Sequence, residues 1–519
     1  METLTAVLAI LVASAALYAL SVRVGLPYPT LFVLGGLGLA FVPGIPHIRL
    51  EPDLVLLVFL PPLLFIAAIE TPIRELRANI APITRLALGL VIFTVITVAI
   101  VAQALVPSMG WAAAITLGAI VAPTDAIAAT SVFRRLGVPR VVTTLVEGEA
   151  LFNDASALII YRAGVAVVAG GSFVLLATAG EVVVALVAGI LIGAVVGWLG
   201  AQLLSRLDDP TVEVLISFVI PFAAFLPADV LGVSGVLAAV TAGLVIGSRY
   251  GRILTARSRV LWLGAWKMVG FVLNGFVFLL IGLELPTVVE ALQGRARFEL
   301  AGVVLVVCLV VVGTRFVWTY LSSQLPNSPY RRLRERDPRL ANWMRFIVSW
   351  AGLRGAVSLA AALALPHSFP ERDLILLTTF VVIIVTLVGQ GATLPWLVRR
   401  ATVGSEDVDG DEPTMAREIV YQAGLTEVDR QRSVWPDHQP LLDRLESGLR
   451  DRTQHLATAD PDETAVRDQE RIEHEQIQLA VIAAQRAAVI ELRDSRQIND
   501  ETLRLVEREL DLEELRMEG

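Results

Sequence analysis

The 519-residue chain is poor in charged residues, lysine and cysteine. Charged residues make up 18% of it, the only lysine is Lys267, and the only cysteine is Cys308. An ordinary soluble domain has about 25% charged residues. A single cysteine excludes a disulfide within the chain and gives no support to a thiolate metal site. These shortages argue against a secreted protein, a nucleic-acid-binding protein and a wholly soluble chain.

Apolar residues, in contrast, make up 55% of the chain and occur in long runs. A membrane-spanning helix needs about 20 of them in succession. Suitable windows, some of them short, fall near 4–22, 28–43, 53–69, 84–106, 111–131, 149–169, 181–203, 211–227, 231–247, 261–285, 299–321, 343–365 and 373–397. The sequence therefore predicts an all-α polytopic membrane protein with about 13 transmembrane helices.

The charge of the chain is divided unequally between two parts. Residues 401–519 hold 14 arginines and 29 acidic residues, whereas residues 1–400 hold 28 basic and 21 acidic residues. Apolar residues of the second part recur at three- and four-residue intervals, which is typical of amphipathic helices. We therefore predict a transmembrane domain over 1–400 and an acidic helical tail over 401–519.

The loop arginines indicate the orientation of the chain in the membrane. Cytoplasmic loops are enriched in lysine and arginine. The odd-numbered loops and the end of the last span hold 19 arginines, and the even-numbered loops hold four. This alternation predicts an N-terminus outside the cell and a cytoplasmic tail.

The fifth apolar window is interrupted by Pro123. Proline lacks a backbone N–H and disfavours helical geometry at the preceding residue, so nearby carbonyls lose their helical partners. Unpaired groups at membrane depth survive only where they face protein or a cavity. Asp125 follows at the start of the second half-helix, where helix dipoles favour a negative charge. Free carbonyls beside one carboxylate predict a site for a monovalent cation.

The sixth window contains Glu149, Asn153 and Asp154. Glu149 and Asn153 are four residues apart and share one helix face. A helix in lipid does not support two free carboxylates, because each buried charge costs several kcal/mol. One acid must therefore pair with a cation, and the other must be able to take a proton.

The twelfth window carries an arginine, Arg354, between Gly352 and Gly355. Glycine permits close helix approach or local unwinding. Arg354 needs a partner, and Glu149 is the predicted one. Three other charged residues are interpreted as lying near span ends, where they reach the membrane surface: Glu213, Glu284 and Arg315.

The two interrupted windows, the fifth and the twelfth, are seven positions apart in the order of the spans. An odd separation gives opposite orientations, which is typical of inverted repeats whose broken helices meet at a binding site. We therefore predict two inverted repeats, roughly residues 1–170 and 211–398, with the two broken helices crossing.

These motifs together resemble a known family. They are Ala122-Pro123-Thr124-Asp125, Gly148-Glu149-Ala150-Leu151-Phe152-Asn153-Asp154 and Gly352-Leu353-Arg354-Gly355-Ala356. The pattern is similar to that of bacterial NhaP-like sodium/proton exchangers of the cation:proton antiporter-1 family. The resemblance covers roughly residues 1–400.

The resemblance implies roles for individual residues. Asp154 would bind Na+ or a proton in turn, with Asp125 and the Thr124 carbonyl helping to coordinate the metal ion. Asn153 and Pro123 would position the unwound chain at the crossing. The pair Glu149 and Arg354 would form a structural bridge. The family also implies a homodimer with a moving core domain, and no cofactor.

Two positions depart from the family pattern. Relatives often have serine where this chain has Ala150, so a hydroxyl ligand is missing and the cation preference is open. Relatives also commonly place an acid where this chain has Ile66, and the next acid is Glu70. Glu70 is a candidate gate at the cytoplasmic mouth.

The expected function is secondary antiport in a bacterial plasma membrane, not enzyme catalysis. The chain would exchange Na+, and also Li+, for H+ in an electroneutral one-to-one ratio by alternating access. The lipid bilayer would be its partner, and nucleic acid would not. Two alternatives remain open: a K+/H+ antiporter of the same fold, and a cation-responsive membrane signalling protein with the tail as its output.

Overall fold

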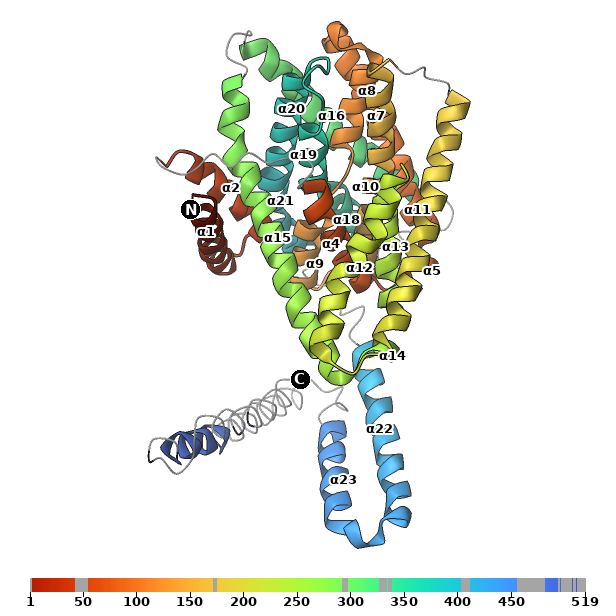
Figure 1. Ribbon diagram of the computed structural model, residues 1–519, viewed down its shortest axis with the longest axis vertical. Helices are drawn as coiled ribbons and strands as arrows, with labels where there is room; N and C mark the ends of the chain where they lie inside the picture. The colour runs from red at the N-terminus through yellow and green to blue at the C-terminus, as the bar shows by residue number, and fades with distance from the viewer. Residues whose placement is uncertain are drawn as a thin grey trace. The chain divides into compact units, whose positions relative to one another are not determined.

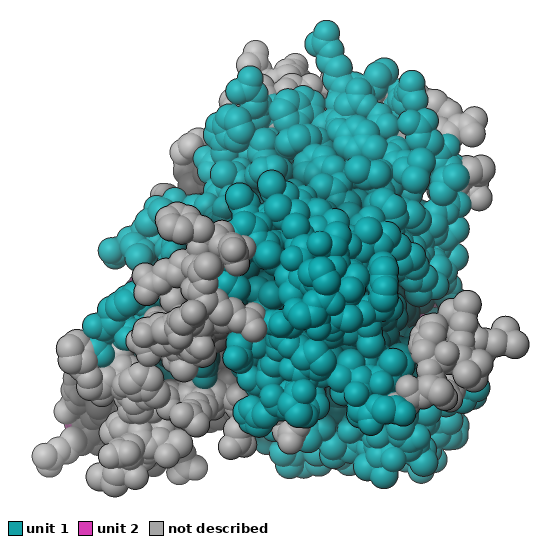
Figure 2. Space-filling view, turned by 90° about the horizontal axis from the view of Figure 1, so that it is seen from above, with its two compact units in different colours: residues 1–405 teal, residues 406–519 magenta. Residues whose placement is uncertain are grey.

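The computed structural model describes a chain of two compact units. The described residues are 2–42, 55–170, 175–291, 297–325, 334, 338–402, 411–454, 481–492, 495, 506 and 510. The first unit is Met1–Ser405 and the second is Glu406–Gly519. In the space-filling view, the first unit is one continuous packed body (Figure 2). All regular structure in the described ranges is helical, which confirms the predicted all-α class.

The first unit is a bundle of long, roughly aligned helices with shorter ones between them (Figure 1). Its first half contains α1 (Glu2–Val24), α2 (Tyr28–Ala40), η1 (Val55–Phe59), α4 (Leu60–Glu70), α5 (Ile73–Ala78), α6 (Ile80–Thr84), η2 (Arg85–Gly89), α7 (Leu90–Leu105), η3 (Pro107–Met109), α8 (Gly110–Val121), α9 (Ala126–Arg135) and α10 (Arg140–Val168). Its second half contains α11 (Leu175–Leu204), α12 (Pro210–Val230), α13 (Gly235–Gly247), α14 (Tyr250–Ile253), α15 (Ala256–Ala291), α16 (Arg297–Ser323), α18 (Pro338–Trp350), α19 (Ala356–Leu363), α20 (Arg372–Ile384), η4 (Val385–Gln390) and α21 (Gly391–Thr402).

Seven stretches of the described chain are long and apolar enough to cross a membrane. They are Ile80–Leu105, Val142–Val168, Val183–Leu204, Pro210–Val230, Arg257–Glu284, Leu300–Ser323 and Arg372–Arg400. Shorter apolar helices accompany them: Leu8–Val24, Tyr28–Ala40, Leu57–Glu70, Pro107–Val121 and Gly235–Gly247. A multi-pass helical membrane fold follows, whereas the total of thirteen spans stays a prediction.

Small residues allow some of these helices to pack at short distance. Helix α2 packs on α15, and α13 packs on both α4 and α11. A Cβ atom at Gly36 would lie 2.0 Å from the Leu279 carbonyl oxygen, and one at Gly282 would lie 2.2 Å from that of Val33. Glycine at both positions therefore lets the backbones of α2 and α15 touch, as small residues do between membrane helices.

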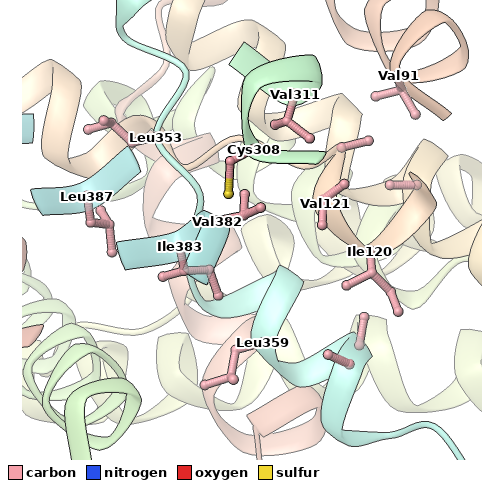
Figure 3. Close-up of a cluster of buried hydrophobic side chains, with 14 of the residues drawn as sticks. Val91, Ile120, Val121, Cys308, Val311, Leu353, Leu359, Val382, Ile383 and Leu387 are labelled. Carbon is pink, nitrogen blue, oxygen red and sulfur yellow. The ribbon is translucent and has the colours of Figure 1, made fainter. Parts of the chain in front are cut away.

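Both windows predicted to be interrupted are divided into two helices. Residues 122–125 separate α8 from α9, and residues 351–355 separate α18 from α19. The apolar core continues around these breaks. Figure 3 shows Val121 and Leu353, one from each interrupted segment, near Cys308 of α16, and all three side chains are buried. The breaks therefore lie inside the protein and not at its surface.

Two sequence predictions about charged residues differ from the structure. Helix α10 begins at Arg140, well before the predicted start of the sixth span, so Glu149 and Asp154 lie inside a helix. Glu213 lies near the start of a candidate span, as predicted, but it is buried within the protein. It lies in the first turn of α12 with 0% exposure, and neither carboxylate oxygen has a hydrogen-bond partner among the described residues. Glu284 is half-buried near the end of a candidate span.

The second unit contains a helical hairpin. Helix α22 (Asp411–Val434) turns through η5 (Pro436–His438) into α23 (Gln439–Gln454). Arg432 near the end of α22 pairs with Asp443 of α23 at 2.7 Å. On the exposed surface of α22, a hydrogen bond from Arg430 lowers the pKa of Glu427 to about 2. Of the predicted helical tail beyond α23, residues 481–492 are helical, and most of the remainder lies outside the described residues.

Candidate functional site

The two helix breaks bind each other directly. The backbone N–H of Asp125, in the first break, donates a 2.7 Å hydrogen bond to the carbonyl oxygen of Leu353, in the second. A Cβ atom at Gly355 would lie 2.2 Å from Oδ2 of Asp125. Only glycine fits at this contact without a shift. The crossing therefore satisfies backbone groups that neither interrupted helix can satisfy alone.

Asp125 lies at the start of the half-helix α9. Its Oδ1 accepts a 2.8 Å hydrogen bond from the backbone N–H of Ile127, which is the geometry of an N-cap. The other carboxylate oxygen, Oδ2, faces the second break at Gly355. The hydrogen bond at Oδ1 thus holds the Asp125 side chain at the crossing.

Helix α10 holds the first break through the Thr124 hydroxyl. That hydroxyl donates to Oε1 of Glu149 at 2.9 Å and accepts from Nδ2 of Asn153 at 2.6 Å. Glu149 and Asn153 are 0% and 1% exposed, and Asp154 is 7% exposed. The predicted shared face of Glu149 and Asn153 is therefore the face that binds the break, and Asp154 is directed elsewhere.

The predicted pair of Glu149 with Arg354 is wrong, because Glu149 binds Arg315. The Arg315 guanidinium donates to both carboxylate oxygens, with 3.0 Å between Nη2 and Oε2, and its Nε donates to the Val348 carbonyl at 3.0 Å. Arg315 is 1% exposed and lies within a candidate span of α16, so its predicted position near a span end is also wrong. A bidentate pair between planar groups explains why arginine occupies this position.

Arg354 binds the backbone of the two breaks instead. Its Nε donates to the carbonyl oxygen of Val121 at 3.1 Å, and its Nη1 donates to that of Gly352. Val121 ends α8, so the guanidinium satisfies a carbonyl that the interrupted helix leaves open. Its own backbone N–H donates to Oγ1 of Thr386 at 3.1 Å. Arg354 therefore joins the first break, the second break and η4.

A cavity of about 460 Å³ lies against the crossing. Five of the predicted site residues line it: Asp154, Asp125, Thr124, Pro123 and Glu70. Glu149, Asn153 and Arg354 are not part of its lining and lie in the wall behind it. The two aspartates thus face one shared space, where oxygen ligands suit a hard cation.

Charged side chains surround the outer end of this cavity. Arg134 of α9 pairs with Glu70 of α4 at 3.2 Å and with Glu147 of α10 at 2.9 Å. The Arg134 and Glu70 side chains are 55% and 40% exposed, so this end meets the surface. Lys267 lines the same cavity. The sequence analysis identified Glu70 as a candidate gate but did not identify its partner Arg134. The one sequence feature that could have indicated Arg134 is its position near the end of a half-helix.

A second cavity of about 490 Å³ follows the other half of α10. Asp154 lines the first cavity, and the next residue, Ala155, lines the second. Arg162 of α10 and Asp229 of α12 both line this second cavity and form an ion pair at 2.6 Å. Leu60 of α4 lines both cavities, so they come within one side chain of each other.

Comparison with known proteins identifies the family. A family model described as "Sodium/hydrogen exchanger, transmembrane" matches residues 7–400. The chain belongs to the sodium/hydrogen exchanger family. The predicted resemblance to NhaP-like exchangers is thereby confirmed, and the chain is a multi-pass cation/proton antiporter and not an enzyme.

Individual relatives agree with this family membership. An uncharacterised Na+/H+ exchanger of Mycobacterium tuberculosis is 35% identical over 503 residues, which cover 94% of this chain and 91% of that protein. A low-affinity Na+/H+ antiporter of Synechocystis is 31% identical over 429 residues, which cover 80% of this chain and 77% of that protein. A sodium, potassium, lithium and rubidium/H+ antiporter of Bacillus pumilus is 32% identical over 388 residues, which cover 72% of this chain and 58% of that protein.

A solved structure supports the fold of the exchanger. The sodium proton antiporter of Methanocaldococcus jannaschii superposes with a TM-score of 0.61 at 17% identity. The match covers 78% of this chain and 100% of that one. At this identity the likeness concerns the architecture alone.

Replacing Arg315 should destabilise the exchanger strongly. Arg315→Met would leave the Glu149 carboxylate buried without its cationic partner, and breaking a buried ion pair costs about 3–5 kcal/mol. The fall in Tm of the detergent-purified protein measures this loss. Arg162→Met is the matched control, because its pair with Asp229 is partly exposed and should contribute about 0–1 kcal/mol.

A double-mutant cycle separates the two buried arginines. Glu149→Gln should lose most of its effect on Tm in the Arg315→Met background and keep it in the Arg354→Met background. Equal coupling of Glu149 to both arginines would contradict the assignment of the pair.

Proposed function

We propose that this exchanger transports Na+, with Li+ as a second cation, against H+ in a one-to-one ratio by alternating access. The observation that carries the proposal is the placement of Asp154 and Asp125 in one cavity beside the helix crossing. Family membership supplies the reaction class, and the names of the Synechocystis and Bacillus relatives support sodium. The choice of cation and the stoichiometry belong to the proposal.

Competition at Asp154 couples the two fluxes. A carboxylate oxygen that coordinates a metal ion cannot also hold a proton there. Either partner neutralises the charge, whereas the bare carboxylate is costly to move through an apolar environment. The loaded forms of the core therefore cross the barrier, and the empty form does not. This selective crossing makes exchange obligatory.

The cation would be held by oxygen atoms from two elements. Asp154 comes from α10, and Asp125 and Thr124 come from the first break. Pro123 has no N–H to donate, so it cannot complete the helical hydrogen bond to the carbonyl four residues earlier. Asn153 positions the break through its hydrogen bond to the Thr124 hydroxyl, at 2.6 Å. The proposed ligands are hard oxygen donors, as alkali cations prefer.

The arrangement of the two cavities supports alternating access. The first cavity lies along the N-terminal half of α10 as far as Asp154, and the second lies along the C-terminal half from Ala155 onwards. A cluster of buried apolar side chains, including Leu64, Leu151 and Phe225, packs beside Leu60 where the cavities come together. The Arg162–Asp229 pair joins α10 to α12 along the second cavity. In this conformation the aspartates communicate with the first cavity, and the apolar cluster separates them from the second.

Glu70 serves as a gate at the cytoplasmic mouth in this proposal. It pairs with Arg134, which also binds Glu147, so one arginine connects α4, α9 and α10 around the entrance. The arginine-rich loops support a cytoplasmic location of this mouth and of the 401–519 tail, with the N-terminus outside. The protein works as a homodimer in the bacterial plasma membrane.

Asp154→Asn should abolish exchange, because an amide neither takes a transportable proton nor supplies a charged ligand. In everted vesicles, Na+ should then no longer restore the fluorescence of a dye quenched by ΔpH. Asp373→Asn, the same chemical change at an exposed acid of α20, is the matched control and should behave like the wild type. Normal recovery of fluorescence in Asp154→Asn vesicles would refute the assignment.

Exchange should carry no net charge. Asn153 is neutral, and Glu149 is held by Arg315, so Asp154 offers one readily exchanged proton. Recordings on a solid-supported membrane should therefore show no current when a Na+ gradient drives transport. A current that scales with the transport rate would overturn the one-to-one ratio.

A K+/H+ antiporter is the second candidate, favoured by one position in the cavity. Ala150 lines the cavity with a methyl group where relatives often have a hydroxyl, and the Bacillus relative is named for potassium as well as sodium. Titrations of Na+, Li+ and K+ at fixed pH in proteoliposomes separate the candidates. We expect half-maximal exchange at lower Na+ and Li+ than K+, and the reverse order would favour the alternative.

A further inference from the structure

One hydroxyl in the cavity, that of Ser358, has no assigned role. Ser358 lies in the first turn of α19 and lines the cavity that contains Asp154 and Asp125. The residue is 1% exposed. Its Oγ has no hydrogen-bond partner among the described residues. A buried hydroxyl without a partner costs free energy, so such a group calls for an explanation.

Four other buried hydroxyls among the described residues also lack a partner, those of Ser14, Thr94, Thr319 and Thr378, but none of them lines the cavity. Several others have a local partner. Thr379 and Thr386 each donate to the carbonyl oxygen four residues earlier, at 2.8 Å, and Ser349 does the same. For Ser358 the residue four positions earlier is Arg354, which lies in the second break and is not helical. The Arg354 carbonyl is therefore not in the helical position from which it would accept this bond. The break leaves the Ser358 hydroxyl free at the wall of the cavity.

The beginning of α19 is close to the proposed ligands. Gly355, directly before α19, contacts the Asp125 carboxylate so closely that a Cβ atom would lie 2.2 Å from Oδ2. Ser358 follows three residues later, and residues three apart on a helix are neighbours on one face. Both positions line the cavity. The free hydroxyl thus faces the same space as the two aspartates.

We infer that the Ser358 hydroxyl is a further ligand of the transported cation and helps to set the preference among Na+, Li+ and K+. This inference rests on the proposed function, because it assumes a cation at Asp154. A hydroxyl oxygen has two lone pairs and no charge, so it coordinates a cation without changing the charge that is transported. Because Ser358 lies in α19, directly after the second break, segments at both breaks would then contribute ligands to the cation.

Removing the hydroxyl should weaken cation binding without abolishing transport. Ser358→Ala should raise the apparent KM for Na+ by about tenfold, the size expected for one lost contact to a charged group. The change in KM for K+ should be smaller, which reduces the preference for Na+. Ser358→Thr keeps the oxygen and should stay within about twofold of the wild type in KM. Initial rates in proteoliposomes at fixed pH measure these values.

Ala150 provides a rescue within the same cavity. Ala150→Ser adds a hydroxyl on α10, and in the Ser358→Ala background it should lower the apparent KM for Na+ towards that of the wild type. Ser349→Ala is the matched control. Ser349 is equally buried on α18, but its hydroxyl is bonded to the Arg345 carbonyl at 2.8 Å, outside the cavity lining. This control should leave KM unchanged.

The outcomes distinguish the inference from the proposed function. An unchanged KM and ion preference in Ser358→Ala, with exchange still lost in Asp154→Asn, would overturn the role of Ser358 alone. A fall in kcat and Tm without a change in KM would show a structural role and overturn it equally. No cation exchange by the wild type would overturn both the proposed function and the inference.

Discussion

The fold of this exchanger depends on how it satisfies backbone groups inside an apolar environment. Two helices stop in the middle of the protein, and each stop leaves carbonyl and N–H groups without their helical partners. The Asp125 N–H binds the Leu353 carbonyl, and Arg354 binds the carbonyls of Val121 and Gly352. The two interruptions therefore satisfy each other's backbone groups, whereas either one alone would leave buried polar groups unpaired at a cost in free energy. The positions of Asp125, Gly355 and Ser358 all follow from this mutual satisfaction.

Helix α10 joins this crossing to the rest of the protein. One of its faces anchors the first break through Thr124, Glu149 and Asn153, and the adjacent position directs Asp154 into the cavity. The role of the Glu149–Arg315 pair is thus to fix α10 against α16 and the break. The paired acid Glu149 and the proposed ion-binding acid Asp154 lie only five residues apart on α10. Glu149 binds Arg315, whereas Asp154 faces the cavity.

Much of this architecture could be predicted from the sequence, because it follows from local properties. Apolar runs located the helices, Pro123 marked one break, and Gly352 and Gly355 marked the other. The partner of Glu149 could not be predicted, since Arg315 and Arg354 are both buried and only the register between α10 and its neighbours selects one of them.

The start of α10 and the burial of Glu213 escaped prediction for similar reasons. Residues 140–148 mix polar and apolar side chains, so hydropathy does not reveal that the helix extends through them. Whether a residue in a first helical turn is exposed depends on which helices pack around it. The free hydroxyl of Ser358 is a consequence of the break and has no local sequence signal.

The burial of Arg354 at the crossing has a consequence for the electrostatic balance of the site. Three carboxylates gather there, Glu149, Asp125 and Asp154, together with two guanidinium groups, Arg315 and Arg354. Counted formally, the five side chains sum to a single negative charge. One univalent guest, whether an alkali ion or a hydron, brings the ensemble to neutrality, and a second would leave an excess positive charge in a poorly polarisable interior.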